Sequence, residues 1–203
     1  LAESITADDV RKLKKDNPGI PVVTYVNTSA DVKAETDICC TSANAVKIIE
    51  SLNVDKVIFL PDEYLAKYVA SKTNVKIISW KGKCEVHEQF TDTEIIELRK
   101  KYPNLKVVSH PECPPEVINA SDFTGSTGSM INYVKNTHAK DIFLVTECSM
   151  SDNIQIENPN INFVKPCNLC PHMKKITLHG ILKSLKEENN YIEIDKKIIQ
   201  KAK

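Results

Sequence analysis

The chain has 203 residues, of which 41% are hydrophobic and 27% charged, a balance typical of a globular protein with room for one large or two small domains. Its 27 Lys and Arg residues are matched by 27 Asp and Glu, so no basic excess indicates a nucleic-acid or membrane surface. The sequence shows neither a signal peptide nor an apolar run of the roughly 18 residues that a membrane span needs. We therefore expect a cytoplasmic protein.

The first part of the chain alternates helix-like segments with short apolar strands. The apolar runs are continuous, which is typical of parallel strands covered on both faces. Such alternation predicts an α/β fold with three layers and short parallel sheets. Helices are expected at 8–16, 43–52 and 63–71, and strands at 21–25, 37–40, 57–60 and 75–80.

The second part of the chain repeats this pattern at an offset of 85 residues, with Tyr25 falling on His110. Near the end of the repeat the offset becomes 86, and Cys84 falls on Cys170. Four aligned blocks at almost one offset are improbable by chance. We therefore predict two copies of one pseudo-symmetric α/β domain, at 1–85 and 86–172, followed by a segment at 173–203.

The repeat also predicts a third copy before the first residue. The chain starts at Leu1 rather than Met, within helix-like sequence. By the alignment, the partner of Cys84 falls two positions before Leu1, so we expect a further domain that ends there in a cysteine. The segment at 173–203 is expected to form a helix, a strand at 191–194 and a basic helix, and to pack on that domain.

Polar side chains follow equivalent strands of the two copies. Tyr25 and Asn27 leave one strand, and His110 and Glu112 leave its equivalent. Ligands of parallel α/β units bind at the carboxyl ends of strands, and residues spaced i, i+2 share a face. A histidine beside a carboxylate suits acid–base chemistry near neutral pH. We therefore predict that both pairs belong to one site.

Hydroxyl side chains stand at the next strand-to-helix junction of each copy. Ser42 lies there in the first copy, and Ser126 and Thr127 in the second. Free backbone N–H groups at a helix N-terminus favour anions, although Ser and Thr are also ordinary helix caps. Two such junctions in register favour binding of a phosphate or carboxylate group.

The chain has seven cysteines, and without a secretory signal a disulfide framework is not expected. Cys167 and Cys170 form a Cys-x-x-Cys pair, which is open to three interpretations. It can be a redox pair, part of a zinc site with His87 or His172, or one arm of a symmetric iron–sulfur site shared with Cys84. Three thiolates from three like domains would leave one iron of a cubane cluster open for Lewis-acid chemistry.

Several segments, in this order and spacing, resemble the quinolinate synthase family over the whole chain: YVNTSA, TSANAV, GKCEVH, HPECP, GSTG and CPHMK. The resemblance implies three pseudo-symmetric domains around a [4Fe–4S] cluster. It also implies condensation of iminoaspartate with dihydroxyacetone phosphate to quinolinate, for NAD biosynthesis. An iminoaspartate-supplying enzyme is then a possible partner.

Carried over by these segments, Cys84 and Cys170 would be cluster ligands, and Tyr25, His110 and Glu112 would be catalytic. The same three residues would bind substrate together with Asn27, Ser42, Ser126 and Thr127. The chain without its preceding domain is expected to be inactive. Two other classes stay open: a non-catalytic binder of a small phosphorylated acid, and a zinc-dependent lyase or hydrolase using Cys84, Cys170 and His110.

Overall fold

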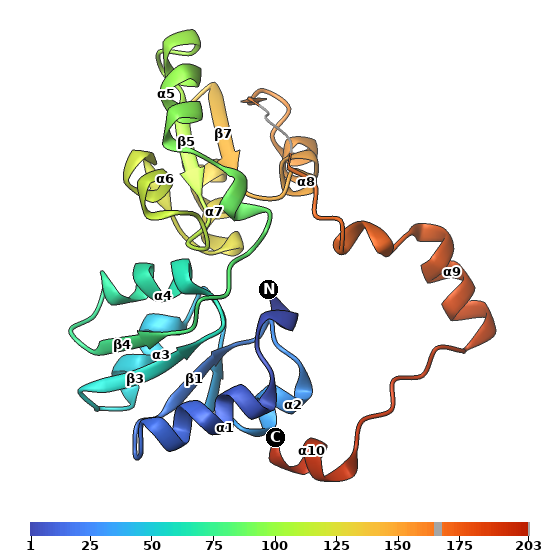
Figure 1. Cartoon of the computed structure of the whole chain (residues 1–203). Coiled ribbons are helices and arrows are strands. Elements are labelled where there is room, and N and C mark those ends of the chain that lie inside the picture. The colour runs from blue at the N-terminus through green and yellow to red at the C-terminus, as the bar shows by residue number, and fades with distance from the viewer. Residues whose placement is uncertain (165–167, 203) are drawn as a thin grey trace.

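The computed structural model describes residues 1–164 and 168–202, which form two units, each built on a four-stranded parallel sheet (Figure 1). The order of strands is β2-β1-β3-β4 in the first unit and β6-β5-β7-β8 in the second. The first sheet contains β1 (Val22–Tyr25), β2 (Ile38–Cys40), β3 (Lys56–Leu60) and β4 (Lys76–Ser79). The second contains β5 (Lys106–Ser109), β6 (Phe123–Thr124), β7 (Asp141–Val145) and β8 (Asn162–Phe163). The predicted fold class, repeated α/β with short parallel sheets, is confirmed.

Helices cover both faces of each sheet, so each unit has three layers. Successive strand residues point to opposite faces, which is why neighbours such as Val22 and Val23 are both fully buried. Val22 packs with Val10 and Val32 of the helices on one face, whereas Val23 packs with residues of the helices on the other. The first unit carries α1 (Ala7–Asp16), α2 (Ala30–Ala34), α3 (Ala45–Ser51) and α4 (Glu63–Ala70). The second carries α5 (Asp92–Lys101), α6 (Pro115–Ala120), α7 (Thr127–Asn136) and α8 (Ser149–Glu157).

The offset read from the sequence also relates individual hydrogen bonds. The Asp37 carboxylate accepts from the backbone N–H of Val22 at 2.8 Å, and Asp122 accepts from Val107 at 2.9 Å. Each carboxylate also pairs with a cation of the first helix of its unit, Lys14 at 3.0 Å in one unit and Arg99 at 2.8 Å in the other. The two units are therefore built by the same local interactions, although few residues are identical.

One part of the repeat occurs a third time. A single 3₁₀ turn precedes a threonine-capped helix at η1 (Ala2–Ser4), at η2 (His87–Gln89) and at η3 (Met173–Lys175). The caps are Thr6, Thr91 and Thr177, which stand before α1, α5 and α9 (Leu178–Glu187). The sequence predicts a helix near α9 but not this equivalence. Helix α9 thus shares its threonine cap and its preceding 3₁₀ turn with the first helix of each unit.

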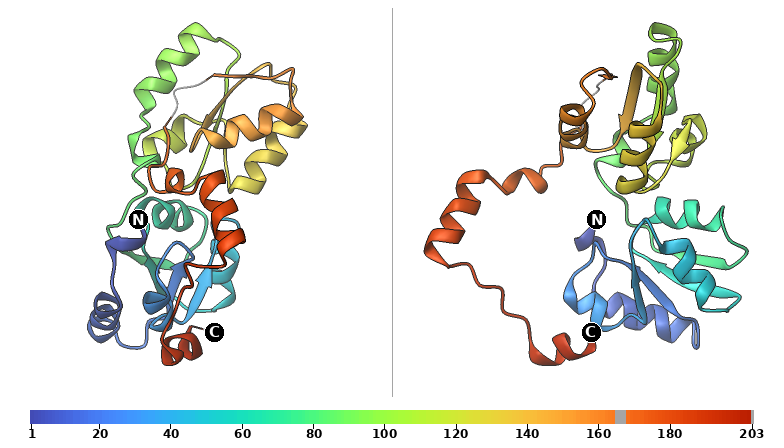
Figure 2. Two further views of the ribbon diagram at one scale, coloured as in Figure 1. Left: turned by 90° about the vertical axis from the view of Figure 1, so that its right-hand side faces the viewer. Right: turned by 180° about the vertical axis from the view of Figure 1, so that it is seen from behind.

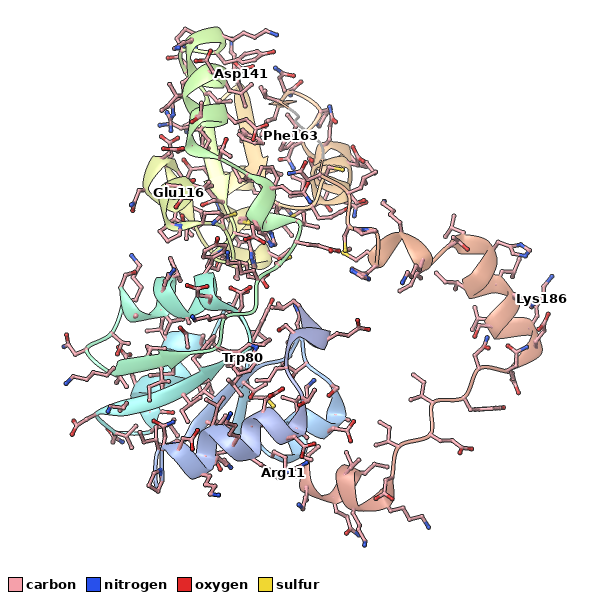
Figure 3. The ribbon with its side chains drawn as sticks, in the orientation of Figure 1. Arg11, Trp80, Glu116, Asp141, Phe163 and Lys186 are labelled. Carbon is pink, nitrogen blue, oxygen red and sulfur yellow. The ribbon has the colours of Figure 1, made fainter. Side chains whose placement is uncertain are left out.

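The C-terminal segment contacts the first unit through its last helix, whereas α9 lies away from both units. In Figures 1 and 2 it leaves the second unit, loops away with α9 and returns to the first unit at α10 (Lys196–Lys201). Figure 3 shows Lys186 on α9, away from both sheets. No residue of α9 is buried, and Leu178 and Leu185 are 87% and 73% exposed. At its end, Lys201 pairs with Glu35 beside α2 at 3.6 Å.

The prediction of a strand at 191–194 is wrong for the described chain, in which this stretch has no regular structure. A strand needs a neighbour to complete its backbone hydrogen bonds, and none lies beside it here. Tyr191 and Ile192 are accordingly 81% and 87% exposed. Among the described helices, none has the length and apolar character needed to cross a membrane.

Candidate functional site

A cavity of about 870 Å³ lies between the two units, at the carboxyl ends of β1 and β5. Its volume is within the range of small-molecule sites. The wall combines strand ends, the loops that carry Cys84 and Cys170, and the N-terminal turn η1. Seven of the nine residues predicted for the site line it: Tyr25, Asn27, Cys84, His110, Glu112, Thr127 and Cys170.

Ser42 and Ser126 are not part of the cavity wall. The Ser42 hydroxyl lies 3.3 Å from Nε2 of His110, so it contacts the site through that histidine. The Ser126 hydroxyl accepts from the backbone N–H of Ser129 and caps α7, and Ser126 is only 8% exposed. Capping therefore accounts for Ser126 in this structure, and substrate binding by it stays a prediction.

A chain of polar side chains crosses the floor of the cavity. Glu112 Oε2 lies 3.1 Å from Nδ1 of His110 and 3.6 Å from Nδ1 of His87. The two imidazole rings are stacked, with centroids 4.8 Å apart. Beyond them, Nε2 of His87 lies 3.0 Å from the hydroxyl of Thr146. With Ser42 at the other end, five side chains from both units form one path of polar groups, although the 3.6 Å between Glu112 and His87 exceeds the length of a hydrogen bond.

The environment sets the charges along this path. Burial lowers the pKa of His87 to about 4, assisted by the neighbouring His110, so its imidazole is neutral near pH 7. Burial by itself would raise the pKa of Glu112, but the hydrogen bond and charge of His110, together with other nearby charges, outweigh burial and hold that pKa below its ordinary value. Glu112 is thus a buried carboxylate. Its Oε1 has no hydrogen-bond partner among the described residues, and neither has Nδ1 of His87.

Tyr25 supplies a proton donor on the opposite wall. It is the last residue of β1 and is 7% exposed. Burial, together with the nearby negative charge of Glu112, raises the pKa of its phenol well above the ordinary value. The hydroxyl therefore stays protonated near neutral pH and can donate a hydrogen bond to a polar group in the cavity.

Cys84 and Cys170 reach the cavity from the two units in equivalent ways. Met173 donates its backbone N–H to Sγ of Cys170 at 3.5 Å. The backbone N–H groups of His87 and Val86 lower the pKa of the Cys84 thiol, although burial dominates and raises it to about 11. Thiolates that accept backbone N–H groups are typical ligands of iron–sulfur clusters, so the residues present fit such a group.

The structure separates Cys113 from this arrangement. Cys113 is fully buried behind the wall, with Sγ 3.4 Å from the carbonyl oxygen of Val145. Cys167, expected as a spare ligand or as half of a Cys-x-x-Cys disulfide, lies outside the described residues. One compact group of metal-binding atoms is formed within the described part of the chain by Cys84, His87 and Glu112, whose donors lie within 4.8 Å of one another.

Sequence reasoning underestimated His87 and missed Thr146. The rule that ligands gather at strand ends was applied only to β1 and β5, whereas Thr146 directly follows β7 and lines the same cavity. Extending the rule to the third strand of each unit would have found it. His87 entered only as a possible zinc ligand, because a single histidine after a cysteine gives no sign that it will stack on His110.

Comparison with known proteins gives the family. The family described as quinolinate synthetase A protein matches residues 1–203. The chain is 56% identical to quinolinate synthase 1 of Mesorhizobium japonicum over 203 residues, which are 63% of that protein. It is 55% and 57% identical to quinolinate synthases of Xylella fastidiosa and Sinorhizobium fredii, of which it spans 60% and 56%. In each case the whole of this chain is covered, and the chain belongs to the quinolinate synthase family.

Proposed function

We propose that this chain is part of a quinolinate synthase that condenses iminoaspartate with dihydroxyacetone phosphate in NAD biosynthesis. The observation that carries the proposal is the meeting of Cys84, Cys170 and the His110–Glu112 pair in one cavity between equivalent units. The chain spans about 56 to 63% of its relatives, so we also propose that a further domain completes the site. Its cysteine would stand two positions before Leu1.

We propose domain limits of 1–85, 86–172 and 173–203, with the last segment packing on the further domain. The equivalence of α9 with α1 and α5 supports this division. A helix that begins a repeat, with no residue of its own buried, needs the rest of that repeat to cover its apolar side chains. The exposed Leu178, Ile181, Leu182 and Leu185 would form that contact.

We propose that Cys84, Cys170 and the cysteine of the further domain hold a [4Fe–4S] cluster. When bound, a cluster with one open iron supplies a Lewis acid for dehydration. Glu112 is then suited to hold or move a proton at Oε1, which has no other partner among the described residues. Nδ1 of His110 lies 3.1 Å from the Glu112 carboxylate and its Nε2 faces Ser42, so His110 can orient the carboxylate and relay a proton.

The other wall residues would bind and orient the substrates. Tyr25 presents a protonated phenol and Asn27 an amide, both suited to carboxylate and carbonyl oxygens. Thr127 lies at the N-terminus of α7, where backbone N–H groups favour an anion. We propose that Thr127, with Ser126 and Ser42 nearby, holds a phosphate or carboxylate. An iminoaspartate-supplying enzyme remains a candidate partner.

Anaerobic purification of the protein with its N-terminal region tests the proposal. A brown protein with thiolate-to-iron absorption is expected. Cys84→Ala should abolish both cluster and activity, whereas Cys113→Ala should keep the cluster because its thiol faces Val145. Cluster loss in the Cys113 variant but not in the Cys84 variant would overturn the ligand assignment.

His110→Ala separates chemistry from cluster binding. We expect it to keep the cluster and to lose turnover by about 10² to 10⁴-fold, the usual contribution of a general acid or base. Near-normal turnover would return His110 to a structural role.

The second candidate, a zinc enzyme, draws support from the compact Cys84, His87 and Glu112 group. A colourless protein with stoichiometric zinc would favour it.

A further inference from the structure

The loop that leads to each cavity cysteine, Cys84 or Cys170, is hydrogen-bonded to the start of the helix that follows the third strand of its unit. In the first unit, the backbone N–H of Glu63 donates to the carbonyl of Gly82 at 2.7 Å. In the second, the N–H of Cys148 donates to the carbonyl of Asn168 at 3.3 Å. Gly82 and Asn168 each stand two residues before a cavity cysteine. The same backbone hydrogen bond thus occurs in both units, although the two loops differ in sequence.

An acidic residue precedes each of these donors and faces the cysteine that follows. Glu147 accepts from the backbone N–H of Ser149 at 2.9 Å with one oxygen and from the N–H of Cys170 at 3.4 Å with the other. Asp62 caps α4 by accepting from Leu65 at 2.6 Å, and its backbone forms a parallel bridge with Gly82, two residues before Cys84. The two acids are equivalent under the repeat, and Glu147 links a helix start to a cysteine.

Capping by itself does not explain these two acids. Asp62 is fully buried, and its Oδ2 has no hydrogen-bond partner among the described residues. Burying a carboxylate costs free energy that a neutral hydroxyl cap avoids. Thr6, Thr91 and Thr177 show that neutral caps are used elsewhere in this chain. A carboxylate has a second oxygen, which a hydroxyl lacks, and that oxygen is available for the cysteine backbone.

We propose that Asp62 and Glu147 are positioning residues that hold the backbones of Cys84 and Cys170, so that both thiolates face the cavity. Charge-assisted hydrogen bonds are stronger than neutral ones, and groups that hydrogen-bond to a metal ligand fix its orientation. The part of this inference that concerns the cluster rests on the proposed function. The part that concerns the backbone does not.

The test replaces each acid by its amide, Asp62→Asn and Glu147→Gln. An amide has the same size but one acceptor oxygen, so it can serve the helix start or the cysteine, not both. Asn remains a good cap, which protects the fold of α4. Hydrogen exchange on the 203-residue chain is the first measurement. We expect the Cys84 amide to exchange at least about tenfold faster in Asp62→Asn, with Cys170 unchanged, and the reverse in Glu147→Gln.

Cluster retention is the second measurement, made on the protein with its N-terminal region. Loss of a residue that hydrogen-bonds to a metal ligand typically costs about 10- to 100-fold in metal affinity. Each variant should therefore lose its cluster to a chelator faster than the unaltered protein, by a similar factor. Ser29→Ala is the matched control, because it removes the cap that Ser29 gives to Val32 at 3.3 Å, away from both cysteines. It should lower thermal stability and leave cysteine exchange and cluster lifetime unchanged.

Unchanged exchange at Cys84 in Asp62→Asn and at Cys170 in Glu147→Gln would overturn the inference. Faster exchange with a normal cluster lifetime would also overturn the role toward the thiolates. If the unaltered protein takes up no iron, the proposed function fails. The exchange measurement then still decides whether the two acids hold the cysteine backbones.

Discussion

Protonation of His87 should destabilise the fold as the pH falls. The imidazole is 7% exposed, stacks on His110 and has a pKa lowered by burial to about 4. In the unfolded chain the group returns to its ordinary value of about 6.5. Between these two values the unfolded state binds the proton and the folded state does not, so stability is complete above pH 6.5 and is lost as the pH falls toward 4.

The size of the effect follows from the shift. A difference of about 2.5 pKa units, at 1.36 kcal/mol per unit, limits the loss to about 3 kcal/mol. At pH 5 about 2 kcal/mol of this should already be lost. Asp62 acts in the opposite direction, because burial raises its pKa to about 7 and its contribution falls as the pH rises. The raw stability curve therefore combines both groups.

His87→Gln isolates the contribution of the histidine. Glutamine keeps a donor near Thr146 but takes up no proton, so the difference between the two proteins removes the effect of Asp62. Urea unfolding of the 203-residue chain at pH 7, 6 and 5 gives the free energy of unfolding for each. The unaltered chain should lose about 2 kcal/mol more than the variant between pH 7 and pH 5. Exposed His179 supplies the control, as His179→Gln should leave the slope unchanged. Equal slopes for His87→Gln and the unaltered chain would refute this account of His87.

Three further changes test the fold. Gly82→Ala should cost at least about 1–3 kcal/mol in urea unfolding, because its Cβ would lie 2.4 Å from the Pro61 carbonyl oxygen; unchanged stability would contradict the close approach. Thr91→Ala removes the cap at the start of α5 and should lower the free energy of unfolding by about 1 kcal/mol, as seen in the denaturation midpoint, whereas an unchanged midpoint would contradict the role of this cap. Trypsin should cut α9 rapidly at Lys186 in the 203-residue chain and at least about tenfold more slowly when the N-terminal region is present, whereas equal rates would show that this region does not cover the helix.

The positions of the elements were largely accessible from the sequence because they depend on local properties. Apolar runs bounded by Pro and Gly predicted the strands, and the offset of 85 residues predicted that both units share one topology. The failure at 191–194 has a plain cause. The pattern for a strand was present, but a strand exists only beside another strand, and the described chain offers none there.

The sequence by itself determined the repeat, the family resemblance and most of the residues at the strand ends, since each depends on the order of residues along the chain. Only the tertiary structure decided how the units meet. It stacked His87 on His110, placed Thr146 beside His87 and brought Ser42 to within 3.3 Å of His110. These contacts join residues far apart in the sequence. The contact of Ser42 with His110 depends on the packing of one unit against the other, and the contacts of His87 depend on how the loops of the second unit fold, so no local pattern of residues corresponds to them.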